Sequence, residues 1–151
     1  MQKTILVATL LAGAVCTAAA QTHPNFEGTW RLDKARSQYP AESATEVIYQ
    51  HGEVLDISIT EKAAGHTNGP MQIHLTADGK PTTNTVAGNK FTSTTHWEHD
   101  KLVTFVEGDR GQHMTETREL SSDGKTLTVT GYHQDELTKP YYVRVMVKGG
   151  P

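Results

Sequence analysis

Apolar and polar residues alternate one by one along much of this chain. The clearest runs lie at 55–60, 71–76 and 126–130, and valine recurs at every second position of 143–147. Successive side chains of a β-strand point to opposite faces of the sheet, so this period of two gives each strand one apolar and one polar face. No window of eleven residues combines helical spacing with helix caps. The pattern therefore predicts antiparallel strands and an all-β fold.

Turn-forming residues separate these runs at short intervals. They cluster at 51–52, 77–80, 87–89, 99–100, 108–111 and 121–125. Glycine supplies the positive φ that tight hairpin turns require, and Asp or Asn tolerates it. We expect strands near 27–34, 44–50, 53–61, 71–76, 82–87, 90–98, 101–107, 113–120, 126–132 and 141–148.

Short strands joined as hairpins can form a closed barrel or a two-sheet sandwich. A sandwich needs longer crossovers between its sheets, whereas most turns in this sequence are short. A closed barrel also removes exposed sheet edges. The sequence predicts a single antiparallel up-and-down β-barrel of 8–10 strands. Two connections are longer: 35–43, which contains Pro40 and has room for a lid or short helix, and 62–70, which is rich in Gly and small residues.

The N-terminal segment 1–20 forms a separate unit. Lys3 precedes an uncharged apolar run at 4–15, and small residues follow at 17–20. A basic start, a short apolar core and an Ala-rich end are typical of a cleavable signal peptide, and a spanning helix needs roughly 20 apolar residues. We therefore expect a signal peptide at 1–20 and one barrel domain at 21–151, in the periplasm or outside the cell.

The only cysteine of the chain, Cys16, lies inside this expected signal. A lipoprotein anchored through Cys16 is the alternative, although Val15 stands where that processing needs a small residue. A mature domain without thiols excludes disulfides, thiol nucleophiles and cysteine metal sites. Packing and backbone pairing then have to hold the domain together.

Charged residues are scattered singly through the chain. Their balance gives a formal net charge of −3, which offers no electrostatic footprint for nucleic acid. No segment after the signal is apolar enough to span a membrane, so we expect no stable membrane insertion once the signal is cleaved. The sequence leaves the oligomeric state open.

Two stretches resemble bacterial exported lipocalin-like proteins of uncharacterised function. The first is 25–37, Asn-Phe-Glu-Gly-Thr-Trp-Arg-Leu-Asp-Lys-Ala-Arg-Ser, and the second is 116–130, which opens Glu-Thr-Arg-Glu-Leu-Ser-Ser-Asp-Gly-Lys. The resemblance implies a calycin-type β-barrel around a cavity for a small, mostly apolar molecule. It also implies that Gly28 and Trp30 close one end of the barrel, with a late basic residue packed across the indole. Arg144 is the expected basic residue, through cation–π contact and hydrogen bonds to carbonyls.

The chain departs from the lipocalin pattern in three respects. It lacks the disulfide that many lipocalins carry, it shows no clear C-terminal helix, and it has more expected strands than eight. A ten-stranded barrel of the fatty-acid-binding type and a streptavidin-like barrel therefore stay open.

Glu116 and Arg118 are the first candidates for ligand binding, since they share one face of an expected strand. If that face points inward, they form a polar pair in the lumen, where Arg118 could hold a ligand carboxylate bidentately as fatty-acid-binding barrels do. If it points outward, they are a surface pair that contributes little to stability. The alternation leaves both orientations open.

Aromatic residues supply the remaining ligand-binding candidates. Tyr142 and Arg144 share a face two residues apart and could jointly hold an anionic head group, an alternative to the packing of Arg144 on Trp30. Tyr132 and Trp97 are candidates for the lining of the lumen.

Histidines raise a weak metal hypothesis. His96 and His99 lie three residues apart, a spacing that points side chains to opposite faces of a strand unless a turn brings them together. No third ligand follows at a defined spacing, so we assign no metal and no cofactor. The sequence also lacks a Gly-x-Ser-x-Gly elbow, a phosphate loop and a His-Glu-x-x-His motif.

These patterns favour an exported barrel that binds a small apolar or amphipathic molecule in its lumen, rather than an enzyme. Two alternatives stay open: a barrel enzyme that uses a His or Glu of the lumen, and a filled barrel whose outer surface binds a protein. An open apolar cavity would favour the binding protein, and a solidly packed lumen the surface function. A His–carboxylate pair with shifted pKa values in the cavity would favour the enzyme.

Overall fold

The computed structural model describes residues 23–133 and 136–149, so the expected signal peptide at 1–20 and Cys16 lie outside the described residues. The described chain forms one sheet of ten antiparallel strands with the order β4-β3-β2-β1-β10-β9-β8-β7-β6-β5. The strands are β1 Gly28–Leu32, β2 Ser43–His51, β3 Val54–Ala63, β4 His66–Thr76, β5 Pro81–Val86, β6 Asn89–Glu98, β7 Lys101–Gly108, β8 His113–Leu120, β9 Thr126–His133 and β10 Tyr142–Lys148.

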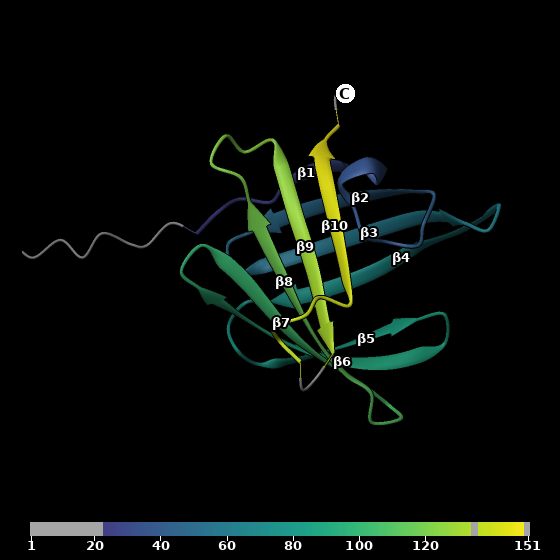
Figure 1. The fold of residues 1–151 in the computed structure, drawn as a ribbon. Coiled ribbons are helices and arrows are strands. Elements are labelled where there is room, and N and C mark those ends of the chain that lie inside the picture. The colour runs from purple at the N-terminus through teal and green to yellow at the C-terminus, as the bar shows by residue number, and fades with distance from the viewer. Residues whose placement is uncertain (1–22, 134–135, 150–151) are drawn as a thin grey trace, which may run out of the picture.

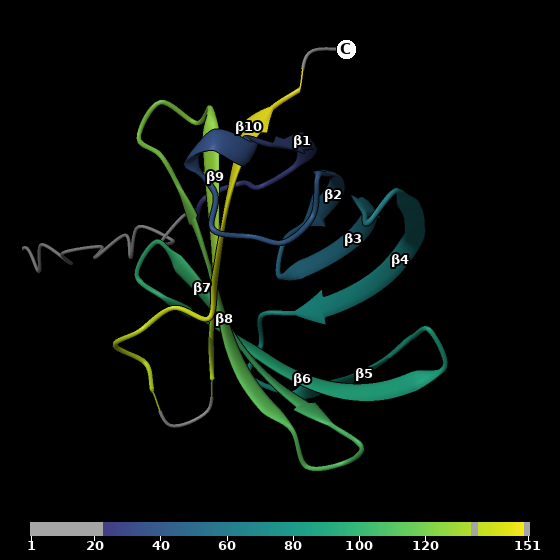
Figure 2. The same cartoon turned by 45° about the vertical axis from the view of Figure 1, so that its right-hand side comes forward.

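The sheet curls on itself into an up-and-down barrel. Figure 1 shows β2, β3 and β4 running across β8, β9 and β10, and Figure 2 shows the interior between these two halves. Sequence neighbours pair in every case except β4 and β5, and β1 pairs with β10 to join the first and last strands. The prediction of an all-β up-and-down barrel is confirmed, with ten strands. In the described ranges, no helix is long and apolar enough to cross a membrane.

The apolar half of the alternation faces the interior of the barrel. Its buried side chains form one core, which consists of Phe26, Trp30, Ile48, Leu55, Ile57, Ile59, Leu75, Ala77, Leu102, Leu127, Val129 and Met146. Removal of this apolar surface from water is the main force that holds a sheet without disulfides together.

The barrel is nearly closed, because β4 and β5 stand at the two ends of the strand order. A side chain replaces the backbone ladder between them. The Asn84 amide oxygen accepts from the His74 backbone N–H at 2.7 Å, and its amide nitrogen donates to the His74 carbonyl at 2.9 Å. The hydroxyls of Thr76 and Thr82 lie 3.0 Å apart in the same seam. Figure 2 shows the β5–β6 hairpin set apart from β4 beyond these contacts.

The two long connections differ from each other. Between β1 and β2 the chain makes a single 3₁₀ turn, η1 Lys34–Arg36, which begins after Asp33. The prediction of a long connection at 62–70 is wrong, because β3 and β4 continue through this range as a hairpin. Ala64 and Gly65 make the turn with φ values of +50° and +77°. The first five residues of β4 are exposed on both faces, and so carry no apolar alternation.

Candidate functional site

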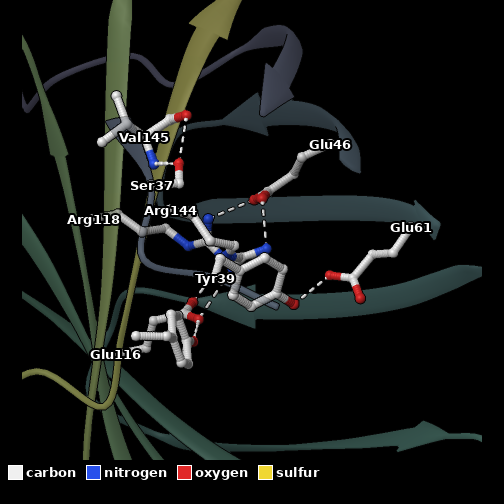
Figure 3. A network of polar contacts seen from close by, with 9 residues as sticks. Ser37, Tyr39, Glu46, Glu61, Glu116, Arg118, Arg144 and Val145 are labelled. Carbon is white, nitrogen blue, oxygen red and sulfur yellow. Dashed lines mark hydrogen bonds and ion pairs between the residues drawn. The ribbon is translucent and has the colours of Figure 1, made fainter. Parts of the chain in front are cut away.

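Four charged side chains from three strands meet inside the barrel (Figure 3). Glu46 comes from β2, Glu116 and Arg118 from β8, and Arg144 from β10. Their immediate neighbours along each strand point to the outer face, so all four side chains point to the interior. The exposed fraction of the side chain is 0% for Glu46, 2% for Arg118, 4% for Arg144 and 13% for Glu116.

The four charges form a closed ring of ion pairs. Arg118 donates to Glu46 at 2.5 Å through Nη1 and to Glu116 at 2.7 Å through Nη2. Arg144 donates to the second oxygen of Glu46 at 3.3 Å and to the second oxygen of Glu116 at 3.2 Å. Every carboxylate oxygen therefore receives one guanidinium N–H, and the ring is electrically neutral. Such pairing offsets the cost of taking these charges out of water.

The ring shifts the pKa values of Glu116 and of the two arginines. Burial opposes the charge of Glu116, but Arg118 and Arg144 outweigh it and lower the pKa of that carboxyl. Burial likewise opposes the charges of the arginines, and the nearby carboxylates outweigh it and raise the pKa of both. Glu116, Arg118 and Arg144 are thus held in their charged forms.

Two tyrosines flank the ring. Tyr142 on β10 donates its hydroxyl to Glu116, and Tyr39 from the β1–β2 connection donates to Glu61 at 2.5 Å. The Arg144 guanidinium carbon lies 5.4 Å from the centre of the Tyr39 ring and 5.6 Å from that of Tyr142. Burial raises the pKa of both phenols. The connection at 35–43, which has room for a lid or short helix, thus contributes a side chain that packs beside the ring.

A half-open cavity of about 180 Å³ adjoins the ring on the side of β4 to β8. Its lining is mainly apolar and consists of Ile73, Leu75, Asn84, Val86, Phe91, Ser93, Thr104, Val106, Met114, Glu116 and Arg118. A second hollow of about 240 Å³ shares Phe91, Val106 and Met114 with it. An apolar cavity of roughly 150 Å³ suffices for benzene, whereas sites for drug-sized ligands run from about 300 Å³. The lumen is therefore packed at one end and hollow at the other.

The packed end contains Gly28 and Trp30. The Trp30 indole N–H donates to the Phe26 carbonyl at 2.8 Å, and its side chain is fully buried. Gly28 has a φ of +135°, and a Cβ there would lie 3.1 Å from the Lys148 side chain. This environment supports the structural role that the resemblance implies for both residues.

The structure corrects the predicted basic partner of Trp30, which is Lys148 and not Arg144. The Nζ atom of Lys148 lies 5.4 Å from the centre of the Trp30 ring, and Lys148 is the residue that pairs with Trp30 across β1 and β10. Arg144, which was expected there, lies four residues earlier on the same inward face. Its height on the strand places it against Glu46 and Glu116 instead.

The structure separates the remaining ligand-binding candidates. Glu116 and Arg118 both line the cavity, and Tyr142 reaches the cavity only through its bond to Glu116. Trp97 lies at the packed end, where it stacks on Phe26 and on His23, and its indole N–H donates to Glu53. Tyr132 alternates with inward-facing Gly131 and is therefore on the outer face of β9. Neither Trp97 nor Tyr132 lines the cavity.

The two candidate metal-binding histidines remain apart from any third ligand. His96 contacts Glu98 at 3.1 Å on the surface, and His99 lies in the following turn with a φ of +57°. Within the described ranges, no group of three or more His, Cys, Asp or Glu residues is placed to hold a metal ion.

Sequence reasoning missed three residues of the candidate site: Glu46 and Tyr39 at the ring, and Asn84 in the lining of the cavity. Glu46 carried a usable signal, because it stands between Ala44 and Ile48 on the apolar face of its strand. An ionisable residue at such a position requires a buried partner. Tyr39 lies in an irregular connection, and Asn84 lies in a strand of mostly polar residues. The apolar–polar alternation therefore identifies neither of them.

No protein-family model and no curated protein matches the sequence. The fold is similar to several solved structures. Fluorescent protein UnaG is 20% identical, with 82% of this chain and 97% of that chain covered and a TM-score of 0.60. Apo lipid binding protein 8 of Caenorhabditis elegans is 14% identical, with coverages of 82% and 95% and a TM-score of 0.59. A fatty acid-binding protein from brain tissue of Drosophila melanogaster is 19% identical, with coverages of 82% and 99% and a TM-score of 0.55.

These likenesses concern the barrel fold. Structures named for lipid or fatty-acid binding are among the similar ones, and a barrel of the fatty-acid-binding type is one of those that the sequence left open. The ten-stranded order is consistent with such a barrel.

Proposed function

We propose that this chain is a carrier or binding protein that holds one small, largely apolar molecule in the hollow end of its barrel. The observation that supports the proposal most is the half-open cavity of about 180 Å³, which is apolar apart from a few polar groups and borders a buried charge ring. Concave apolar sites with a few convergent polar groups are the usual form of small-molecule sites.

The similar solved structures support the same function by analogy. Two of them are named for binding lipids or fatty acids, at 14% and 19% identity to this chain. Fold alone does not define a ligand, so the proposal depends on the cavity rather than on these names.

We also propose that the chain acts in the periplasm or outside the cell. The proposal rests on the basic start, short apolar run and Ala-rich end of segment 1–20. N-terminal sequencing of the protein from its own host would test it: a mature chain that begins at Gln21 is expected, and retention of 1–20 would contradict export.

Binding can be tested by titration with phenylnaphthylamine, an uncharged fluorescent probe of apolar sites. We expect saturable binding with one probe per chain and displacement by apolar competitors. Native mass spectrometry of protein purified from its host should show a co-purified small molecule. Absence of both saturable binding and a co-purified molecule would overturn the carrier function and favour a surface function.

A further inference from the structure

We propose that the ligand of this cavity is uncharged: a hydrocarbon chain or ring that carries at most a neutral oxygen acceptor, and not a carboxylate. The inference rests on the proposed function and names the ligand class of the same site. It follows from how the charges of the lumen are already matched to one another.

The two arginines that could receive a ligand carboxylate have carboxylates of the protein as partners. Arg118 contacts Glu46 at 2.5 Å and Glu116 at 2.7 Å, and Arg144 contacts the other oxygens of the same two residues. A ligand carboxylate would add a third negative charge opposite two positive ones. Among the residues that the structure describes, Arg118 is the only lysine or arginine that lines the cavity.

That extra charge would have to be buried. The cavity lies where Glu116 has a side-chain exposure of 13% and Arg118 of 2%, so water cannot screen an added anion well. A carboxylate would stay an unmatched buried charge unless it broke an ion pair of the ring or took up a proton, and each of these outcomes costs free energy. A neutral ligand leaves the ring intact.

The polar groups that remain available to a ligand are single hydrogen-bond donors. The Nε–H group of Arg118, which lines the cavity, is buried and has no acceptor among the described residues. Ser93 also lines the cavity and is 5% exposed, whereas both ends of the Asn84 amide already bond to His74. One hydroxyl, ester or ketone oxygen could accept such a donor without adding charge.

The size of the site fits the same class. The apolar lining extends from the cavity of about 180 Å³ into the hollow of about 240 Å³, across Phe91, Val106 and Met114. A medium-chain alcohol or ester would match this site, with its polar end near Arg118 and its apolar tail across these three residues.

The test is competition against bound phenylnaphthylamine at neutral pH by three ligands with the same hydrocarbon chain: decanol, methyl decanoate and decanoate. We expect both neutral ligands to displace the probe at concentrations about tenfold or more below that of decanoate, since an unmatched buried charge is costly. Equal or stronger displacement by decanoate overturns the inference and leaves the carrier function standing. Failure of the probe to bind, together with the absence of a co-purified molecule, overturns both.

A variant supplies the converse test. Glu116→Gln keeps the size of the side chain and leaves the ring with one unmatched positive charge. We expect decanoate to gain about tenfold or more in affinity relative to decanol in this variant. Glu119→Gln is the matched control, because Glu119 lies on the outer face of the same strand and pairs with Lys101 at 3.0 Å. A gain in both variants, or in neither, contradicts the inference, and circular dichroism verifies that both fold.

Discussion

The Glu46 carboxylate and the Arg118 guanidinium, 72 residues apart in the chain, meet at 2.5 Å inside the barrel. The contact joins β2 to β8 across the lumen, and no backbone hydrogen bond links these two strands. It therefore holds the two curved halves of the sheet together at the point where the packed core gives way to the cavity.

Removal of Glu46 should destabilise the fold strongly. Glu46→Leu leaves Arg118 and Arg144 buried with half of their partners, and we expect the free energy of unfolding to fall by about 3–5 kcal/mol. Urea unfolding followed by tryptophan fluorescence measures the change. Glu119→Gln breaks only an exposed pair and should cost less than about 1 kcal/mol. A loss for Glu46→Leu no larger than that of the control would contradict a stabilising role for the ring.

Acid should weaken the same ring. The folded-state pKa of Glu116 lies below its ordinary value of 4.5, so the folded protein binds fewer protons there than the unfolded chain. The stability from this group is complete above about pH 4.5 and is lost as the pH falls through the folded pKa. We expect the unfolding free energy of the native protein to fall more steeply with acid than that of Glu116→Gln. Carboxyls outside the ring, such as Asp33 and Asp123, also have lowered pKa values but are present in both proteins.

A parallel slope in the two proteins would contradict this assignment. The measurement is a series of urea unfolding curves from neutral to acid pH, with Glu119→Gln as a control that should keep the native slope. Because Glu119 is about half exposed, its removal leaves the ring intact.

Most of the fold could be predicted because alternation reports which residues face the interior. It located all ten strands, and hairpin turns fixed their order. It failed at 62–70, where both faces of the β3–β4 hairpin meet water and no apolar residue marks the inner one. A hairpin that extends beyond the core leaves no hydrophobic period in the sequence.

The site was less predictable, because alternation gives the face of a residue but not its height in the barrel. Trp97 faces inward, yet its height places it on Phe26 at the packed end rather than in the cavity. The family resemblance implied Arg144 on Trp30, and the face of the strand alone could not correct this, because Lys148 shares that face and occupies the position. The pairing of Arg118 with Glu46 requires strand curvature, which no local pattern encodes.

The seam between β4 and β5 should depend on Asn84. Asn84→Ala leaves the backbone N–H and carbonyl of His74 without these partners, and we expect a loss of about 1–3 kcal/mol in the free energy of unfolding. Hydrogen exchange measured by mass spectrometry should be faster in β4 and β5 of the variant than in the same strands of the native protein. Exchange in β8 and β9 should not change. Thr85→Ala, on the outward face of the same strand, should change stability by less than about 0.5 kcal/mol. Unchanged exchange in β4 would show that other contacts hold the seam.

Val106 offers the sharpest test of where a ligand lies, since it lines both the cavity and the adjoining hollow. Val106→Trp places an indole in this open space, and we expect affinity for phenylnaphthylamine to fall by about tenfold or more, roughly the contribution of one buried apolar contact. The unfolding free energy should change by less than about 3 kcal/mol, because the space is half-open and the ring need not displace the packed core.

Phe105→Trp is the matched control for this substitution. Phe105 is the preceding residue of β7, stacks on His113 on the outer face and is 38% exposed, so the same indole there should leave probe affinity unchanged. Fluorescence titration of both variants, with stability measured in parallel, separates a blocked cavity from a weakened fold. Equal affinity in the native protein and Val106→Trp would place the probe elsewhere and remove the cavity from the function. A loss in Phe105→Trp alone would indicate that the outer face of β7 binds it.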